Sequence, residues 1–287
     1  MWFIADACGI VCFIIGYFLL SVSNYVVVKT GDFPFGPRGD AICLAIYELW
    51  FILAIWSHLT CMLSDPGSIP IDDGVELQAL PDGVRQCTKC KAPKPPRAHH
   101  CSICQRCIQR MDHHCPWVNN CVGARNQKHF VLYLLYVQLQ CYMAIICLGG
   151  RFLSMPEVSS HRDYRKKVFL QRLTRSPNQT QALEASRQLR LYREQVANDE
   201  TNEAGQIVGC ILIFFVALVF GLFTAIMMCD QVSNIISNQS GIDALKGESP
   251  QKPKSWRDSM QEVMGRGPSW RWFLPLPLRR LQEKDET

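Results

Sequence analysis

The sequence predicts an all-α membrane protein with four transmembrane helices and a small β-hairpin domain between the second and the third. Two observations lead to this fold class. Hydrophobic residues make up 48% of the 287 residues, yet they gather in four long, almost uncharged windows separated by polar connectors. The connector between the second and third windows is instead rich in cysteine and histidine. We therefore expect two different kinds of structure in one chain.

Each apolar window is long enough to cross a bilayer. A helix of about 20 apolar residues spans the roughly 30 Å hydrocarbon core. The first window has no basic segment before it and no small-x-small cleavage site after it, so we expect it to remain as an anchor. The four windows cover residues 8–28, 41–63, 130–150 and 207–229.

The first two spans should form an antiparallel hairpin. Their connector is short and is broken by Pro34, Gly36 and Pro37. The second span carries Glu48 and His58, which are ionisable groups at membrane depth. Such groups usually face other helices, so we expect an inward hydrogen bond or a position near the helix end.

The connector after the second span has the composition of a metal-binding domain. Seven of the fifteen cysteines and four of the seven histidines lie within residues 87–121, and three Cys-x-x-Cys steps supply thiols at the spacing of zinc sites. Two tetrahedral sites need eight ligands. Six cysteines and two histidines supply them, which leaves one cysteine over. The histidine pairs at 99/100 and 113/114 leave the ligand assignment open from spacing alone.

The spare cysteine indicates catalysis. If it is Cys115, its thiol stands beside two imidazoles and the carboxylate of Asp112. A cysteine beside an imidazolium ionises more readily, and a base held by an acid is the arrangement of nucleophilic catalysis. The alternative interpretation makes Cys115 or His113 a metal ligand and the domain a binding finger.

The same segment resembles the cysteine-rich domain of the DHHC protein S-acyltransferases (palmitoyltransferases). Asp65-Pro66-Gly67 is similar to the DPG motif of that family, and the flanks at 1–4 and 241–243 resemble its Golgi-type members. The family's Thr-Thr-x-Glu motif is replaced here by Ser240-Gly241-Ile242-Asp243, which puts the contacts of that motif in doubt. The match runs without a gap through Cys87-x2-Cys90-x9-His100-Cys101-x2-Cys104-x2-Cys107-x4-Asp112-His113-His114-Cys115-x5-Cys121-x4-Asn126-x3-Phe130.

The resemblance implies an assignment of the ligands. His113 would remain free as a base beside Cys115, with Asp112 orienting its ring. Both zinc sites would be closed, so that two Zn²⁺ ions are structural. One zinc would be held by Cys87, Cys90, His100 and Cys107, and the other by Cys101, Cys104, His114 and Cys121.

The resemblance also implies the reaction. A palmitoyl group would pass from palmitoyl-CoA through an acyl-Cys115 intermediate to cytosolic cysteines of membrane-associated substrate proteins. The acyl chain would lie in a cavity lined by all four spans, with Gln140 as a chain-length determinant about ten residues into the third span. A catalytically silent adaptor that binds client proteins is the alternative. No nucleic-acid partner is expected, because a finger held between two spans cannot reach DNA, and a RING-type ligase would need a different ligand spacing.

Redox chemistry sets the predicted orientation. Residues 64–129 and residues 154–206 each hold nine Lys or Arg, so charge does not decide. The cytosol keeps thiols reduced, and we expect a cytosolic zinc domain and cytosolic termini in a multi-pass endomembrane protein, with a Golgi membrane implied by the resemblance. Asn178 is then a luminal glycosylation candidate. The predicted segments are 1–63 (two helices and a short luminal hairpin), 64–129 (zinc domain), 130–150, 151–206 (luminal loop), 207–229 and 230–287 (cytosolic tail).

Two polar segments carry weaker predictions. Within the connector, Ala182, Ala185, Leu189, Tyr192 and Val196 fall on one face of a helix, which predicts one modest amphipathic helix. In the tail, the aromatic cluster 270–273, with Arg271 inside it and Arg279 and Arg280 after it, is typical of a membrane-interface anchor.

Overall fold

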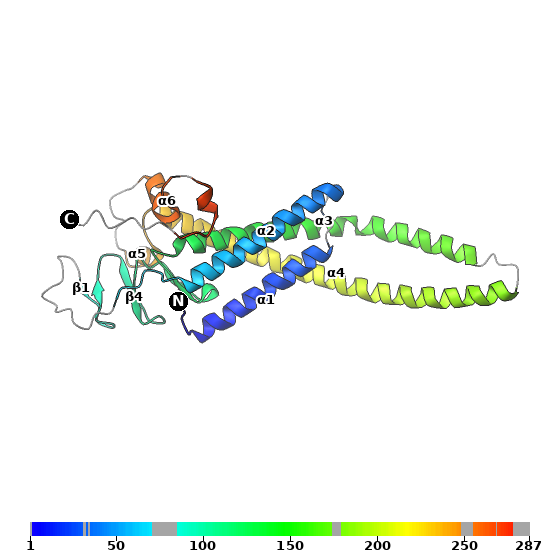
Figure 1. Ribbon diagram of the computed structural model, residues 1–287, viewed down its shortest axis with the longest axis horizontal. Coiled ribbons are helices and arrows are strands. Elements are labelled where there is room, and N and C mark those ends of the chain that lie inside the picture. The colour runs from blue at the N-terminus through cyan, green and yellow to red at the C-terminus, as the bar shows by residue number, and fades with distance from the viewer. Residues whose placement is uncertain are drawn as a thin grey trace. The chain divides into compact units, whose positions relative to one another are not determined.

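Four helices dominate the computed structural model (Figure 1). They are α1 (Ala7–Thr30), α2 (Gly36–Leu63), α3 (Gln127–Leu173) and α4 (Gln179–Ile236). Every predicted apolar window lies inside one of them, which confirms the fold class. The structure describes residues 2–30, 33, 35–70, 85–173, 179–247, 255–267 and 269–277.

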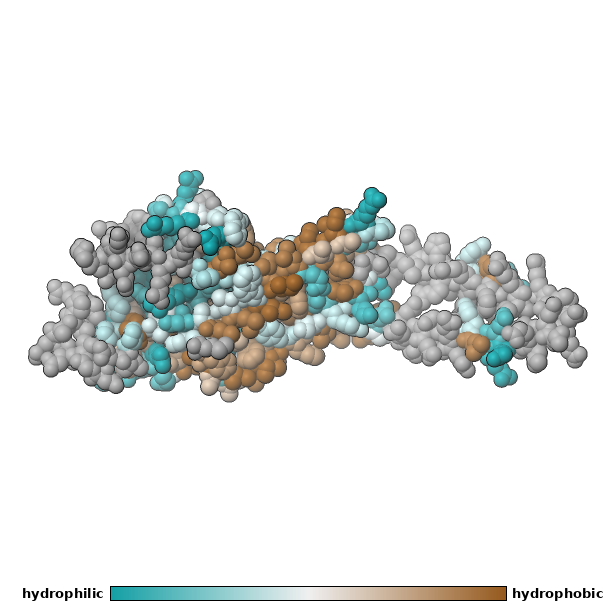
Figure 2. Space-filling model, viewed as in Figure 1, coloured by the Kyte–Doolittle hydropathy of each residue, from teal (hydrophilic) through white to brown (hydrophobic). Residues whose placement is uncertain are grey.

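Parts of these helices are long and apolar enough to cross a membrane. Only 6% of the most apolar window of α1 is buried within the protein, so most of its hydrophobic side chains face outward. Figure 2 shows the hydrophobic surface on the visible faces of these helices. A surface of this kind is stable in lipid and not in water. The candidate spans are Ala7–Thr30, Gly36–Leu63, Gln127–Leu153 and Ala204–Ile236.

The connector 151–206 differs from the expected loop with one modest helix. α3 continues to Leu173 and α4 begins at Gln179, so helix lies on both sides of residues 174–178. Arg, Gln, Glu, Leu and Ala dominate this stretch, and all of them favour helix. The candidate glycosylation residue Asn178 is outside the described residues.

The chain divides into two compact units. The first comprises Met1–Ser21, Glu48–Gln140 and Phe220–Thr287, and the second comprises Val22–Tyr47 and Cys141–Val219. The second unit is helical and has two small apolar clusters. One is centred on Tyr47 and Cys147, and the other on Leu148 and Cys210.

The hairpin domain belongs to the first unit. Within its described residues, six short strands form three antiparallel pairs, β1–β2, β3–β4 and β5–β6. A two-stranded hairpin is marginally stable by itself, and the buried cluster here consists largely of cysteines around Ile108 and Met111. Other interactions must therefore hold the domain together. The strands are β1 (Arg85–Gln86), β2 (Pro93–Lys94), β3 (Ala98–Cys101), β4 (Arg106–Gln109), β5 (His113–Cys115) and β6 (Asn120–Val122).

Buried amides attach the hairpin domain to the end of α2. Asn120 donates from Nδ2 to the carbonyl oxygens of Cys61 (3.0 Å) and Ser64 (2.9 Å), and Asn126 donates to Cys61 (3.3 Å). These carbonyls are among those that a helix C-terminus leaves without intrahelical partners. The Asp65 carboxylate then accepts from the N–H of Gly67 (3.0 Å) and closes the turn that follows the helix.

The predicted tail is partly structured. It contains α5 (Gly241–Leu245), α6 (Trp256–Met264) and the 3₁₀ helix η3 (Trp270–Phe273). Lys128 Nζ, near the start of α3, donates to the carbonyl oxygens of Arg271 (2.9 Å) and Leu276 (3.3 Å). η3 is therefore fixed to α3 through its backbone. In Figure 1, α5 and α6 lie at the same end of the first unit as the hairpins.

Candidate active site and metal centres

Two clusters of cysteine and histidine have the arrangement of metal centres. In each cluster, the four ligand atoms all lie within 4.8 Å of one another. These are the two sets that the family resemblance implied from the sequence, and no cysteine in the chain forms a disulfide. The first set is Cys87, Cys90, His100 and Cys107, and the second is Cys101, Cys104, His114 and Cys121.

The distances between these atoms fit a tetrahedral ion. Zn–S bonds of about 2.3 Å place two sulfur ligands roughly 3.8 Å apart. The Sγ atoms of Cys90 and Cys107 are 3.6 Å apart, and those of Cys104 and Cys121 are 3.4 Å apart. In the second cluster, Nδ1 of His114 lies 3.5–3.7 Å from all three sulfurs. Both sets can therefore hold a Zn²⁺ ion with no position left for water.

Strand alternation explains how neighbouring residues serve different sites. Successive side chains of a strand point to opposite faces. In β3, His100 joins the first cluster and Cys101 the second. In β5, His114 joins the second cluster, so His113 and Cys115 face the other way. The spacing alone could not make this choice between adjacent histidines.

Cys115 is the one cysteine of residues 87–121 that belongs to neither cluster. It is buried at the end of β5, with 5% of its surface exposed, and packs with Phe130 and Leu134 of α3. The chain then turns through the 3₁₀ helix η2 (Pro116–Val118) and Asn119, whose φ of 47° is left-handed. This turn lets β6 return beside β5.

His113 is held by Asp112. Its Nδ1 donates to a carboxylate oxygen of Asp112 at 2.7 Å, and its ring meets Phe130 edge to face. Burial lowers the pKa of His113, but the bond to Asp112 and the Cys115 thiol beside the ring outweigh burial and raise it to about 9. The arrangement is that of a nucleophile, a base and an orienting acid.

Three further donors fix Asp112, and the sequence analysis missed them. Gln231 (2.8 Å) and Asn234 (3.3 Å) on α4 donate from their side-chain amides, and Gly241 donates its backbone N–H (2.8 Å). Burial raises the pKa of Asp112, but the bonds from His113 and the Gly241 N–H outweigh it, and the pKa is lowered. The polar residues 231 and 234, three apart after an apolar span, were the available signal.

The contacts of residues 240–243 explain the Ser-Gly-Ile-Asp sequence at this motif. The backbone N–H of Gly241 bonds to Asp112, and a Cβ at this position would come within 3.3 Å of the carboxylate. Asp243 accepts from Arg97 (3.0 Å) and from Nε2 of His99 (2.8 Å), and it forms a capping box with Ser240. The shortened acid therefore ties α5 to the hairpin domain.

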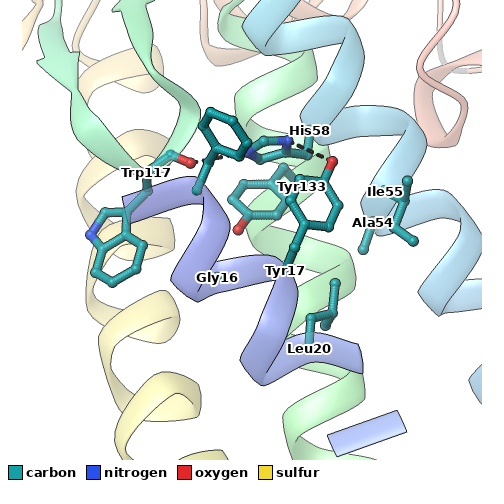
Figure 3. Close-up of a pocket in the computed structure, with 9 residues that line it drawn as sticks. Gly16, Tyr17, Leu20, Ala54, Ile55, His58, Trp117 and Tyr133 are labelled. Carbon is teal, nitrogen blue, oxygen red and sulfur yellow. Dashed lines mark hydrogen bonds between the residues drawn. The ribbon is translucent and has the colours of Figure 1, made fainter. Parts of the chain in front are cut away.

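A pocket lies between α1, α2, α3 and Trp117, two residues after Cys115 (Figure 3). His58 forms its polar wall. The ring donates from Nε2 to the Trp117 carbonyl (2.9 Å) and accepts from the Tyr17 hydroxyl at Nδ1 (3.0 Å). The inward hydrogen bond expected for His58 is thus present. Other lining residues are Phe13, Gly16, Leu20, Ala54, Ile55 and Tyr133.

This pocket differs from the predicted cavity in two respects. Its lining comes from three spans and not four, although Phe220 and Phe223 of α4 pack on the indole of Trp117. Gln140 is buried but is not among the lining residues. The role assigned to Gln140 therefore remains a prediction.

Comparisons with known proteins point to a single family. A family model described as DHHC palmitoyltransferase matches residues 81–248. Palmitoyltransferase ZDHHC3 of Rattus norvegicus is 37% identical over 284 residues, covering 96% of this chain and 83% of the relative. Palmitoyltransferase ZDHHC7 of Mus musculus is 34% identical, and the match covers 98% of this chain and 84% of the relative. Probable protein S-acyltransferase 12 of Arabidopsis thaliana is 38% identical, and the match covers 49% of this chain and 58% of the relative.

Proposed function

Because this chain belongs to the DHHC palmitoyltransferase family, we propose that it acts as a protein S-acyltransferase through the thiol of Cys115. The observation that carries the proposal is the place of this cysteine. Six of the seven cysteines within 87–121 belong to metal-type clusters, and Cys115 instead lies beside His113. A ligand-only finger would leave no reason for a thiol beside a base held by an acid.

The first chemical step forms an acyl-enzyme. His113 takes the proton of the Cys115 thiol at Nε2. The Cys115 thiolate attacks the carbonyl carbon of the acyl-CoA thioester, a new C–S bond forms, and the bond to the CoA sulfur breaks. The departing thiolate takes the proton from Nε2 of His113, while Nδ1 stays bonded to Asp112. The products are acyl-Cys115, free CoA and a neutral imidazole.

The second step transfers the acyl group to a substrate protein. His113 takes the proton of the incoming cysteine thiol, whose sulfur then attacks acyl-Cys115, and Cys115 leaves as a thiolate. One thioester replaces another in each step, so the reaction is nearly isoenergetic. The protein therefore contributes mainly positioning and proton transfer.

The two clusters are proposed to hold two structural Zn²⁺ ions. When bound, these ions supply the cross-links that the short hairpins lack, since zinc contributes about 10–16 kcal/mol in small zinc peptides. The chain's own residues then present Cys115 from a rigid strand.

Palmitoyl-CoA is the proposed donor, and the pocket beside Trp117 is the proposed site for its acyl chain. The lining is largely apolar and begins two residues after the nucleophile. Gln140, deeper in α3, is proposed to limit the length of chain that fits.

We place the hairpin domain and both termini in the cytosol of an endomembrane, with a Golgi membrane suggested by the resemblance to Golgi-type enzymes. Fifteen unpaired cysteines suit a reducing compartment. The acceptors are then cytosolic cysteines of membrane-associated proteins, and Asn178 is luminal.

Acyl labelling tests the proposal. Purified protein is incubated with labelled palmitoyl-CoA, and we expect label on Cys115 that neutral hydroxylamine releases. Cys115→Ser should abolish labelling and transfer while zinc stays near two per chain. Cys229→Ser is the matched control, because Cys229 is an exposed thiol that should acylate if labelling were non-specific. An unlabelled native protein would favour the adaptor, and loss of one zinc from Cys115→Ser would make this residue a ligand.

A further inference from the structure

The N-terminal segment before α1 is bound to the hairpin domain. The sequence suggests only a short tail there, but the indole of Trp2 donates to the side-chain oxygen of Asn120 (2.9 Å), and the amide of Asn119 donates to the carbonyl of Ile4 (2.7 Å). The guanidinium of Arg106 lies 5.2 Å from the Trp2 ring. Trp2 and Ile4 therefore contact β6, the residue before it and β4.

Asp6 ends this segment and has two roles. Its carboxylate accepts from the N–H groups of Cys8 (3.3 Å) and Gly9 (2.9 Å), which caps the first turn of α1. The oxygen that accepts from Gly9 also lies 3.6 Å from Nε2 of His114, a member of the second cluster. Both side chains are largely buried, with 16% of Asp6 and 7% of His114 exposed.

The chemistry of His114 indicates what this contact can do. Its Nδ1 faces the three sulfurs of the cluster, so a metal would bind at that atom. A neutral imidazole that binds metal through Nδ1 carries its proton on Nε2. The Asp6 carboxylate lies 3.6 Å from that nitrogen, which has no hydrogen-bond partner among the described residues. A carboxylate on the far side of a histidine ligand fixes its ring and strengthens its bond to the metal.

The local backbone supports the placement. A Cβ at Gly9 would come within 2.2 Å of the side-chain oxygen of Asn119, so glycine lets the first turn of α1 approach the residue before β6 without moving that side chain. The first cluster differs: among the described residues Nε2 of either histidine ligand, His100 or His114, is buried without a hydrogen bond, but only that of His114 has a carboxylate within 4 Å. The contact is thus specific to the second cluster.

We propose that Asp6 is a positioning residue that holds the metal ligand His114 through its Nε2–H, which makes the N-terminal segment part of the second metal centre. The inference rests on the metal assignment of that cluster and not on acyl transfer. Because Cys115 follows His114 directly in β5, the same contact steadies the strand that carries the nucleophile.

Site-resolved zinc release tests this inference. The full-length protein is challenged with a zinc chelator and a maleimide, and mass spectrometry follows alkylation of Cys101, Cys104 and Cys121 against that of Cys87 and Cys107. We expect Asp6→Ser to accelerate alkylation of the second set roughly 10- to 100-fold, the usual effect of losing such a partner. The first set serves as the internal control and should keep its native rate.

The choice of variants separates the two roles of Asp6. Serine is as good an N-cap as aspartate, but it is too short to reach His114, so Asp6→Ser keeps the helix cap. Asp6→Glu restores a carboxylate and should recover most of the native release rate. Native release from Asp6→Ser, or equal acceleration at both clusters, would overturn the proposal. Fewer than two zinc ions in the untreated native protein would instead refute the metal assignment.

Discussion

At the scale of single residues, the site depends on which way each side chain of β5 points. His113 and His114 are adjacent and chemically identical, yet Nδ1 of His113 bonds to a carboxylate and Nδ1 of His114 faces three thiols. Their roles follow from strand alternation and not from composition. Substituting each in turn should therefore give opposite phenotypes.

For His113→Ala we expect both metals to remain and the autoacylation rate to fall roughly 10²- to 10⁴-fold, the usual scale for a general base. The rate is measured by labelled palmitoyl-CoA and the zinc by elemental analysis. For His114→Ala we expect loss of the second metal and of the hairpin fold. A His113 variant that loses zinc while the His114 variant keeps both ions would reverse the assignment.

A second prediction concerns the donors to Asp112. Gln231 is fully buried, and its amide donates to Asp112 at 2.8 Å. Gln231→Ala removes a hydrogen bond to a charged group, a type worth about 1.5–3 kcal/mol, so we expect acylation to slow roughly tenfold. Asn234→Ala, which removes a longer bond of 3.3 Å, is the matched control and should slow it less. Equal and negligible effects would show that His113 and the Gly241 N–H hold Asp112 without the two amides.

At the scale of secondary structure, helices and hairpins are stabilised in different ways. The spans are apolar and bury their backbone hydrogen bonds internally, whereas the hairpins have two to four residues per strand. The hairpins should therefore depend on metal and the helices should not.

We expect chelation to unfold residues 85–126 while the four spans remain helical. Limited proteolysis should then cut within the hairpins, far-ultraviolet circular dichroism should retain most of its helical signal, and acylation should stop. Readdition of zinc under reducing conditions should restore all three. A chelated protein that resists protease as the native one does would show that the hairpins fold without metal.

The third span carries the prediction on chain length. Gln140 lies about ten residues into it, roughly 15 Å along a helix that rises 1.5 Å per residue. If this amide narrows the acyl cavity, Gln140→Ala should raise the use of stearoyl-CoA relative to palmitoyl-CoA and leave the zinc content unchanged. Gln138→Ala, two positions earlier on a different helix face, is the control. An unchanged ratio would place the floor of the cavity elsewhere, as the lining of the pocket beside Trp117 suggests.

Elements with a strong local signal could be predicted from the sequence. The apolar windows predicted the four spans, and the cysteine spacing indicated the paired clusters. The long extensions of α3 and α4 were missed because their polar faces give no clear periodicity. The donors Gln231 and Gly241 were missed for a different reason, since they lie 119 and 129 residues beyond Asp112. No local pattern encodes a contact over that separation.

At the scale of the whole molecule, orientation in the membrane decides what the enzyme can modify. All fifteen cysteines are unpaired, and six belong to the two clusters. A reducing compartment on the side of the hairpins therefore suits the chain better than an oxidising one.

We expect any glycosidase-sensitive sugar to sit on Asn178 and to vanish in Asn178→Gln. Asn238 also lies in an acceptor triplet, but its amide is buried and accepts from Arg97 (3.1 Å), so a bare Asn238 in the folded protein says nothing about orientation. A membrane-impermeant maleimide supplies the independent measurement. Hairpin thiols that react only from the luminal side of sealed vesicles would invert the topology.

The hydrogen bonds that Asp112 accepts from residues far along the chain have a consequence for biosynthesis. Gly241 follows Asp112 by 129 residues, so a ribosome adding about 5–20 residues per second needs roughly 6–26 s to supply it after Asp112 has been made. During that interval the last span is still being synthesised, and Asp112, proposed to orient His113, lacks its bonds to Gln231 and Gly241. The nascent chain therefore contains Cys115 before all the hydrogen bonds to Asp112 can form. Only a chain that has been translated through its last span completes the catalytic machinery.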